Sequence, residues 1–390
     1  MPSRVFSQKE LIYCDQAATS FPKPPRVAEA VNRALTEQSA SPGRSAHRMS
    51  LAAARVVFET RETLAELFGA RDSSRIAFTS NVTQALNIAL MGYLRTGDHV
   101  LTTCLEHNSV VRPLAWLAKE RGINYEIIPS TEDGIISPAD FGPKVTGRTR
   151  MAIVNHASNV TGVILPIKEI KTILGSVPLL LDVAQTAGAL PIDVEEEYAD
   201  MVAFTGHKSL LGPTGTGGIW IRPGLEIASF FRGGTGSQSE KEDHPEFMPD
   251  RLEAGTQNVH GLAGLSAAVR FIIETGIENI REGELKLTNR FLSGLRQIKS
   301  VTIYGPRDAG SRVALVSMNM AGWSPSDLAR VLDEEFGIMT RAGLHCSPWT
   351  HRAIGTYPSG AVRFSFGLFN TGEEIDRVLS VLEDLGRRKV

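Results

Sequence analysis

The stretch MVAFTGHKSLLGPTGTGGIWI, residues 201–221, holds the features from which the fold class follows. It begins with a short apolar run, passes through Lys208 and a glycine-rich turn, and ends in a second apolar run. Short runs of this kind, bounded by glycine and polar residues, are typical of buried strands. Lys208 is therefore expected at the carboxyl end of a strand, which is where open α/β sheets bind their ligands.

The same pattern extends upstream to about residue 75. Five further apolar runs read as strands, at residues 75–80, 99–104, 124–130, 150–158 and 178–185. Helix-like segments such as TQALNIALMGYL (83–94) and VRPLAWLAKERG (111–122) lie between most of them. This alternation predicts an α/β fold with a mostly parallel seven-stranded sheet covered by helices on both faces.

Downstream of residue 221 the pattern changes. A glycine-rich, charged stretch at 232–249 is expected to be an exposed loop, and a long helical region follows at about 259–300. The remainder reads as an α+β unit, whose closing helix starts at the Thr371–Glu374 capping box. We therefore expect a large domain at 16–258 and a smaller one at 259–390. The N-terminal arm 1–15 is expected to belong to the smaller domain.

Composition excludes several classes of protein. The 390 residues carry a formal net charge of -2, with basic residues spread along the chain, so no nucleic-acid-binding face is indicated. No apolar run reaches the length of a membrane-spanning helix, and the N-terminus lacks a signal-peptide core. Three scattered cysteines, Cys14, Cys104 and Cys346, suggest neither a disulfide framework nor a metal site. A cytoplasmic location is the expectation.

Lys208 and Asp182 suggest a pyridoxal-phosphate (PLP) site. PLP enzymes hold their cofactor covalently through a lysine, and an aspartate keeps the pyridine nitrogen of the cofactor protonated. Asp182 ends the very apolar run at 178–182, so its carboxylate needs a partner, and Gln185 follows three residues later. Alone, Lys208 could equally be a surface residue and Asp182 a helix cap.

Two further sites follow predicted strands. Val82 and Thr83 stand where a strand passes into a helix, and free N–H groups at a helix start bind phosphate. His107 follows the strand at 99–104, where an imidazole could stack on the pyridine ring. Each also has a plain reading, as a helix cap or a solvated histidine. Their order along the chain, all at strand ends, favours the PLP site.

Together these motifs resemble the class V aminotransferase family within the fold-type I PLP enzymes, and in particular the cysteine desulfurases. The likeness covers nearly the whole chain. It rests on YCDQAATS (13–20), TSNVTQALN (79–87), EHNS (106–109), HASNVTG (156–162), DVAQ (182–185), TGHK (205–208), RLEAGTQN (251–258), RAGLHCSPW (341–349) and AVRFSFGLFNT (361–371).

The resemblance implies roles for individual residues. Lys208 would bind the cofactor covalently, His107 would stack on its ring and move protons, and Asp182 and Gln185 would contact its nitrogen and phenolic oxygen. Asn159 would lie near the phenolic oxygen and the substrate carboxylate, which Arg363 would grip with two hydrogen bonds. The phosphate contacts would come from Val82, Thr83, Thr205, His207 and, across the interface of a homodimer with shared active sites, Thr256.

Cys346 is the residue that favours a desulfurase. The resemblance places it where these enzymes carry the thiolate that takes sulfur from L-cysteine, leaving an enzyme persulfide and alanine. His345 beside it could lower the thiol pKa or accept its proton, whereas Cys14 and Cys104 read as buried apolar residues. The short stretch before the strand of Arg363 is similar to the second group of desulfurases. That group works with a sulfur-accepting partner protein and includes enzymes that prefer selenocysteine or cysteine sulfinate.

Some features depart from the family pattern, and other readings stay open. Cys14 and Gln16 replace the usual leucine and asparagine, and the roles of Arg44 and His47 are undefined. Another class V reaction, such as transamination, would not need Cys346. A sulfur-relay docking protein with structural PLP would not need Arg363. A nucleotide-binding reading of GPTGTGG (212–218) fails, because the stretch lacks the Gly-Lys-Ser/Thr ending of a P-loop.

Overall fold

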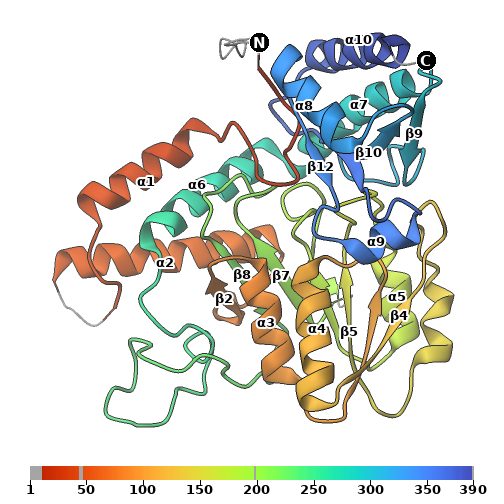
Figure 1. The fold of residues 1–390 in the computed structure, drawn as a ribbon. Coiled ribbons are helices and arrows are strands. Elements are labelled where there is room, and N and C mark those ends of the chain that lie inside the picture. The colour runs from red at the N-terminus through yellow and green to blue at the C-terminus, as the bar shows by residue number, and fades with distance from the viewer. Residues whose placement is uncertain (1–10, 44–46, 197–198, 389–390) are drawn as a thin grey trace.

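The computed structural model describes residues 11–43, 47–196 and 199–388. A large unit is built on a seven-stranded sheet, and a smaller unit, formed mainly by the C-terminal part of the chain, is built on a four-stranded sheet (Figure 1). The short helix α9 (Pro348–Ala353) lies between the two units. The candidate active site lies where the two units meet.

The seven-stranded sheet confirms the predicted fold class and all seven predicted strands. Its order is β2-β8-β7-β6-β5-β3-β4. Strand β8 runs antiparallel to both of its neighbours, β2 and β7, whereas the pairs among the other strands are parallel. The strands are β2 (Ile76–Thr79), β3 (His99–Thr103), β4 (Asn124–Ile128), β5 (Thr149–Asn155), β6 (Leu179–Asp182), β7 (Met201–Thr205) and β8 (Gly217–Ile221).

Helices cover both faces of this sheet. In β7, Met201 and Ala203 face one apolar core, whereas Val202 and Phe204 face the other. Successive side chains of a strand point to opposite faces, so a strand buried on both faces is apolar throughout. The first core is closed by α3 (Val82–Tyr93) and α4 (Asn108–Arg121), and the second by α2 (Arg48–Leu67), α5 (Ile167–Leu174) and α6 (Val259–Thr275).

The two glycines that begin β8 allow close packing. A Cβ atom at Gly217 would lie 2.8 Å from the Cα of Asn81, and one at Gly218 would lie 2.7 Å from the carbonyl oxygen of Ala77. Both contacts are shorter than side chains tolerate, so these positions require glycine. The glycine-rich run 212–218 leads into a strand, which agrees with the rejection of a nucleotide phosphate loop.

The smaller unit has an antiparallel sheet of order β12-β13-β10-β9. Its strands are β9 (Val301–Tyr304), β10 (Leu315–Met320), β12 (Arg341–Gly343) and β13 (Ala361–Ser365), and its helices are α7 (Ile277–Leu295), α8 (Pro325–Phe336) and α10 (Gly372–Arg388). The capping box is confirmed. The Glu374 N–H donates to Thr371 Oγ1 at 3.2 Å, and the Thr371 N–H donates to Glu374 Oε2 at 3.0 Å.

The N-terminal strand of the described chain belongs to the smaller unit. Strand β1 (Ile12–Tyr13) pairs in parallel with β11 (Ile338–Met339), and Ile12 and Cys14 lie in the apolar core of this unit. The predicted long helix divides at Gly276, which has a φ of +83°. Helix α6 packs on α1 (Pro25–Glu37) and α2, and its Leu265 belongs to the core of the large unit. The domain division at residue 258 stays a prediction.

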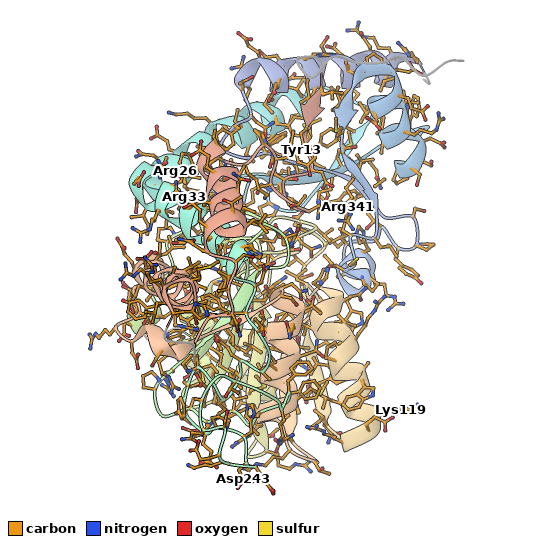
Figure 2. The ribbon with its side chains drawn as sticks, turned by 90° about the vertical axis from the view of Figure 1, so that its left-hand side faces the viewer. Tyr13, Arg26, Arg33, Lys119, Asp243 and Arg341 are labelled. Atoms are coloured by element: carbon orange, nitrogen blue, oxygen red, sulfur yellow. The ribbon has the colours of Figure 1, made fainter. Side chains whose placement is uncertain are left out.

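The remaining segments connect these elements. Residues 232–249 contain neither helix nor strand, as expected for a charged loop. Figure 2 shows Asp243 of this loop at the end of the molecule farthest from Tyr13 and Arg341. None of the helices in the described residues is long and apolar enough to cross a membrane. Short 3-10 turns occur at Ser73–Arg75, Pro138–Asp140, Gly142–Lys144 and Val194–Glu196.

Candidate active site

Lys208 lies three residues beyond the carboxyl end of β7, as the sequence predicted. Burial lowers the pKa of its amino group to about 8, and the positive charges of Arg363 and Arg341 act in the same direction. The carboxylates of Asp182 and Asp15 partly oppose this shift. A fall from 10.5 to about 8 raises the neutral fraction of the amine at pH 7 by roughly two orders of magnitude. Lys208 is therefore prepared to act as a nucleophile.

Asp182 is the last residue of β6, the strand next to β7. Its carboxyl group is buried, and burial raises its pKa. The Ala184 N–H donates to Oδ1 at 2.9 Å, and the charge of Lys208 further favours the ionised form. A buried carboxylate facing the lysine is the arrangement expected opposite a protonated pyridine nitrogen.

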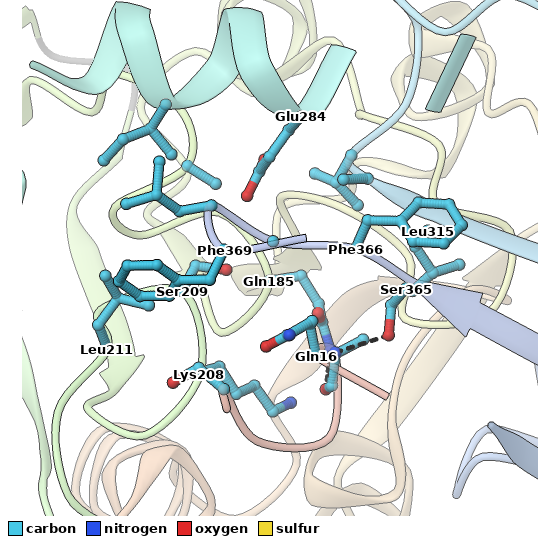
Figure 3. A pocket seen from close by; sticks show the side chains of 18 of the residues that line it. Gln16, Gln185, Lys208, Ser209, Leu211, Glu284, Leu315, Ser365, Phe366 and Phe369 are labelled. Carbon is cyan, nitrogen blue, oxygen red and sulfur yellow. Dashed lines mark hydrogen bonds between the residues drawn. The ribbon is translucent and has the colours of Figure 1, made fainter. Parts of the chain in front are cut away.

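A small pocket of about 40 Å³ lies beside Lys208. Gln185 lines it and donates through Nε2 to the carbonyl oxygen of Ala17 at 3.2 Å, so the amide is already engaged. Figure 3 shows Glu284 pointing into the pocket from α7, from the side opposite Lys208. Burial raises the pKa of Glu284 to about 8, so this carboxyl group, which we did not anticipate, is largely uncharged at neutral pH.

Polar groups suited to a phosphate end the neighbouring strands. Thr205 Oγ1 and His207 Nδ1 are buried and have no hydrogen-bond partner within the described residues. Thr205 pairs with Gly217, which pairs with Thr79, so the start of α3 lies two strands away. Buried polar atoms normally have partners, and both side chains can donate to an anion. These atoms and the free N–H groups at the start of α3, at Val82 and Thr83, fit the phosphate of PLP.

His107 caps the start of α4. The Ser109 N–H donates to its Nδ1 at 3.0 Å, and burial, with the nearby charge of Lys208, lowers the pKa of the imidazole to about 4. The ring is therefore neutral at pH 7 and carries its proton on Nε2. His107, Thr83 and Cys346 line a common cleft of about 510 Å³. The charge of Lys208 lowers the pKa of His107, so the lysine acts electrostatically on a residue of this cleft.

Cys346 is the exposed cysteine of the chain, whereas Cys14 and Cys104 are buried, and burial raises the pKa of both thiols. Cys346 lies in the turn between β12 and α9. The Asn108 N–H donates to the Cys346 carbonyl oxygen at 2.7 Å. Both His345 (φ +49°) and Cys346 (φ +57°) adopt left-handed backbone conformations. Such conformations cost free energy in non-glycine residues and persist only where surrounding contacts enforce them.

Asn159 provides two of those contacts. Its Nδ2 donates to the carbonyl oxygen of His345 at 2.8 Å, and its Oδ1 accepts from the hydroxyl of Ser347 at 2.8 Å. The buried side chain thus holds both neighbours of Cys346. The amide of Asn159 bonds to residues of the turn 344–347 around Cys346, which we name the cysteine turn. The expected contacts of Asn159 with the phenolic oxygen and the substrate stay predictions.

His345 is turned away from the role we considered for it. Its Nε2 lies 3.1 Å from the carbonyl oxygen of Arg341, and its Nδ1 lies 3.3 Å from Nε2 of His351. Burial is the main reason why its pKa falls to about 2. With both ring nitrogens engaged, His345 is not placed to accept the proton of the Cys346 thiol.

Arg363 extends from β13 and is almost fully buried. Its Nη2 lies 2.8 Å from Asp15 Oδ1, and its Nη1 donates to the carbonyl oxygen of Asn159 at 3.0 Å. Its Nε is buried without a partner among the described residues, so the guanidinium has a free donor for a substrate carboxylate. We did not single out Asp15, although its position after an apolar run was a signal that it needs a partner.

The other predicted residues lie outside this cluster. Thr256 is exposed and lines a separate hollow with Ser80 and Gln84, so its assignment to a second subunit stays a prediction. His47 caps α2, because its Nδ1 accepts from the Ser50 N–H at 3.2 Å. Arg44 lies outside the described residues.

Comparisons with known proteins show the family to which the chain belongs. The family profile described as Aminotransferase class-V matches residues 12–378. The chain belongs to the class V aminotransferase family. Its members use PLP, which agrees with the orphaned polar atoms near Lys208.

Relatives within the class V family carry desulfurase names. A probable cysteine desulfurase of Pyrococcus abyssi is 36% identical, over 97% of this chain and 94% of its own length. The cysteine desulfurase of Yersinia pseudotuberculosis is 31% identical, over 98% and 95%. The apo structure of the cysteine desulfurase from Thermococcus onnurineus has a TM-score of 0.91 and 34% identity, covering 97% of this chain and 96% of that one.

Proposed function

We propose that this protein is a PLP-dependent cysteine desulfurase that converts L-cysteine to L-alanine and receives the sulfur as a persulfide on Cys346. The observation that carries the proposal is the exposed Cys346 thiol, held in a left-handed turn and sharing a cleft with His107. The desulfurase relatives, which align over nearly the whole chain, support the same reaction.

Each residue of the site would have a separate role. Lys208 would hold the cofactor, Asp182 would face its ring nitrogen, and Thr205 and His207 would donate to its phosphate. When bound, PLP withdraws electrons from the α-carbon of the substrate and so prepares the bond between Cβ and sulfur for cleavage. Arg363 would bind the substrate carboxylate with its guanidinium, whose Nε has no partner among the described residues.

Cys346 performs the sulfur transfer. Its thiolate forms a bond to the substrate sulfur while the bond between that sulfur and Cβ breaks. The electron pair of the broken bond stays with the carbon skeleton, and protonation of Cβ gives alanine. One L-cysteine and one enzyme thiol thus become one alanine and one persulfide. A thiol, either a reductant or an acceptor protein, then removes the sulfur and restores Cys346.

A single-turnover experiment tests this proposal. We expect PLP-loaded enzyme mixed with L-cysteine without reductant to release about one alanine per site and to gain the mass of one sulfur atom on the peptide containing Cys346. Stoichiometric alanine with no added sulfur on that peptide would contradict a persulfide at Cys346. If L-cysteine gives no alanine, the same assay with selenocysteine and cysteine sulfinate tests the other substrates of the second group.

Substitution of Arg363 by lysine tests substrate binding. Lysine keeps the positive charge but cannot reproduce the two-pronged geometry of a guanidinium. We expect KM for L-cysteine to rise at least roughly tenfold, which corresponds to losing one charge-assisted hydrogen bond. Steady-state kinetics give the result, with the cofactor absorbance as the control for an intact PLP site. An unchanged KM would exclude Arg363 as the carboxylate partner.

The proposal also covers the oligomeric state, the sulfur acceptor and the cellular compartment. Thr256 would reach the phosphate of a second copy of the chain, which makes the working form a homodimer with shared active sites. The persulfide would pass to an acceptor protein, as in the second group of desulfurases. Because Cys346 must act as a free thiol, we expect a reducing, cytoplasmic compartment.

A further inference from the structure

Three buried side chains on either side of Cys346 in the sequence form a hydrogen-bonded chain that we name the histidine relay: His345, His351 and Thr356. His345 Nδ1 lies 3.3 Å from His351 Nε2, and His351 Nδ1 lies 2.7 Å from Thr356 Oγ1. The two imidazole rings also stack, with centroids 5.4 Å apart. His345 is 5% exposed, His351 0% and Thr356 6%, so these bonds form almost entirely away from water.

The carbonyl oxygen of Arg341 fixes the direction of every bond in the histidine relay. A carbonyl oxygen can only accept, so His345 Nε2 must donate to it. In a neutral ring, His345 Nδ1 then accepts from the N–H at Nε2 of His351. His351 Nδ1 in turn accepts from the hydroxyl of Thr356. Burial lowers the pKa of His351 to about 4, which keeps both rings neutral at pH 7.

One member of the histidine relay, His345, is itself a left-handed residue of the cysteine turn. His345 and Cys346 are consecutive left-handed residues, and the contacts of Asn159 and Asn108 hold the backbone of that turn. The ring of His345 is anchored to His351 of α9 and, through His351, to Thr356 of the segment after it. Loss of this anchor leaves the backbone free to relax toward ordinary conformations, which would displace the Cys346 thiol.

We propose that His351 and Thr356 are positioning residues that hold the Cys346 turn in its reactive conformation. The inference rests on the proposed role of Cys346 as the sulfur acceptor. Neither residue touches the substrate in this arrangement. Both act through the ring of His345, and the hydroxyl of Thr356 completes the chain of donors and acceptors.

Thr356→Val and Thr356→Ser form a matched pair of variants. Valine has the shape of threonine but leaves His351 Nδ1 without a donor, whereas serine keeps the hydroxyl. We expect Thr356→Val to slow persulfide formation in single turnover by roughly tenfold to a hundredfold, the range for a buried acceptor left unpaired. KM and the cofactor absorbance should not change, since Arg363 and Lys208 lie on other elements. Thr356→Ser should recover most of the rate.

Alkylation of Cys346 by iodoacetamide in the cofactor-free protein gives a second readout. In Thr356→Val the rate should differ from wild type several-fold, and in Thr356→Ser it should match wild type. Equal persulfide and alkylation rates in wild type, serine and valine proteins would overturn the proposal. If Cys346→Ala still released alanine, the proposed function would fail instead, so the two failures are distinguishable.

His351→Gln and His351→Asn test the same point if Thr356→Val does not fold. A glutamine amide nitrogen stands near the position of Nε2 and keeps the donor to His345, whereas an asparagine amide stands near Nδ1 and loses it. We expect the glutamine variant to form persulfide faster than the asparagine variant, in folded fractions checked by circular dichroism. The reverse order would show that the contact with His345 does not position the turn.

Discussion

Replacement of Cys346 by alanine is expected to abolish the release of alanine from L-cysteine while the protein keeps its fold and its bound PLP. The thiol is exposed, so its removal leaves no cavity and no unpaired buried group. The contacts that hold the turn involve the carbonyl oxygens of His345 and Cys346 and the hydroxyl of Ser347, all of which the variant retains. The loss would therefore report chemistry and not folding.

The assay compares wild type and Cys346→Ala, with a reductant present and with both alanine and sulfide measured. Loss of a nucleophile typically costs several orders of magnitude in rate. Cys104→Ala serves as the matched control, because that thiol is buried and lies outside the cleft. If Cys346→Ala released alanine at the wild-type rate, another class V reaction on the same scaffold would replace the desulfurase proposal.

Replacement of Lys208 by alanine is expected to remove both the absorbance of covalently bound PLP and all turnover. Burial brings the pKa of the amine close to neutrality, to about 8, and no side chain of the described residues forms a hydrogen bond with it. The thermal stability should not fall, since ionising a buried amine disfavours folding. An unfolded variant would point to a structural role for Lys208.

The measurement is an absorbance spectrum after incubation with PLP and desalting, followed by the alanine assay. Lys23→Ala is a useful control, because burial lowers the pKa of that amine to about 8 as well, while its Nζ donates to Ser20 Oγ at 2.9 Å. A Lys208→Ala protein with the normal spectrum would refute the attachment site, whereas Lys23→Ala should keep it.

The strands and their terminal residues were predictable because local rules decide them. Burial on both faces makes each strand uniformly apolar, and polar residues such as Asp182 and Lys208 then mark the ends. The division of the helical region at Gly276 was less apparent, since a single glycine is tolerated within many helices.

The contacts around Cys346 could not be predicted from the sequence. A left-handed conformation at two consecutive non-glycine residues has no sequence signature, and it decides where the ring of His345 points. The amide of Asn159 bonds to residues 186 and 188 positions away. Such pairings depend on how the two units meet, which local patterns do not determine.

The ion pair between Asp15 and Arg363 can form only late in the synthesis of the chain. These side chains are 348 positions apart, and the strand of Arg363 also bonds to the backbone of Cys14. A ribosome must therefore deliver almost the entire polypeptide before the arginine can meet its partner. A product that ends before Cys346 would contain every strand of the seven-stranded sheet, yet it would lack both the thiol and the arginine. Such a truncated chain would lack the residue on which we propose that the persulfide forms.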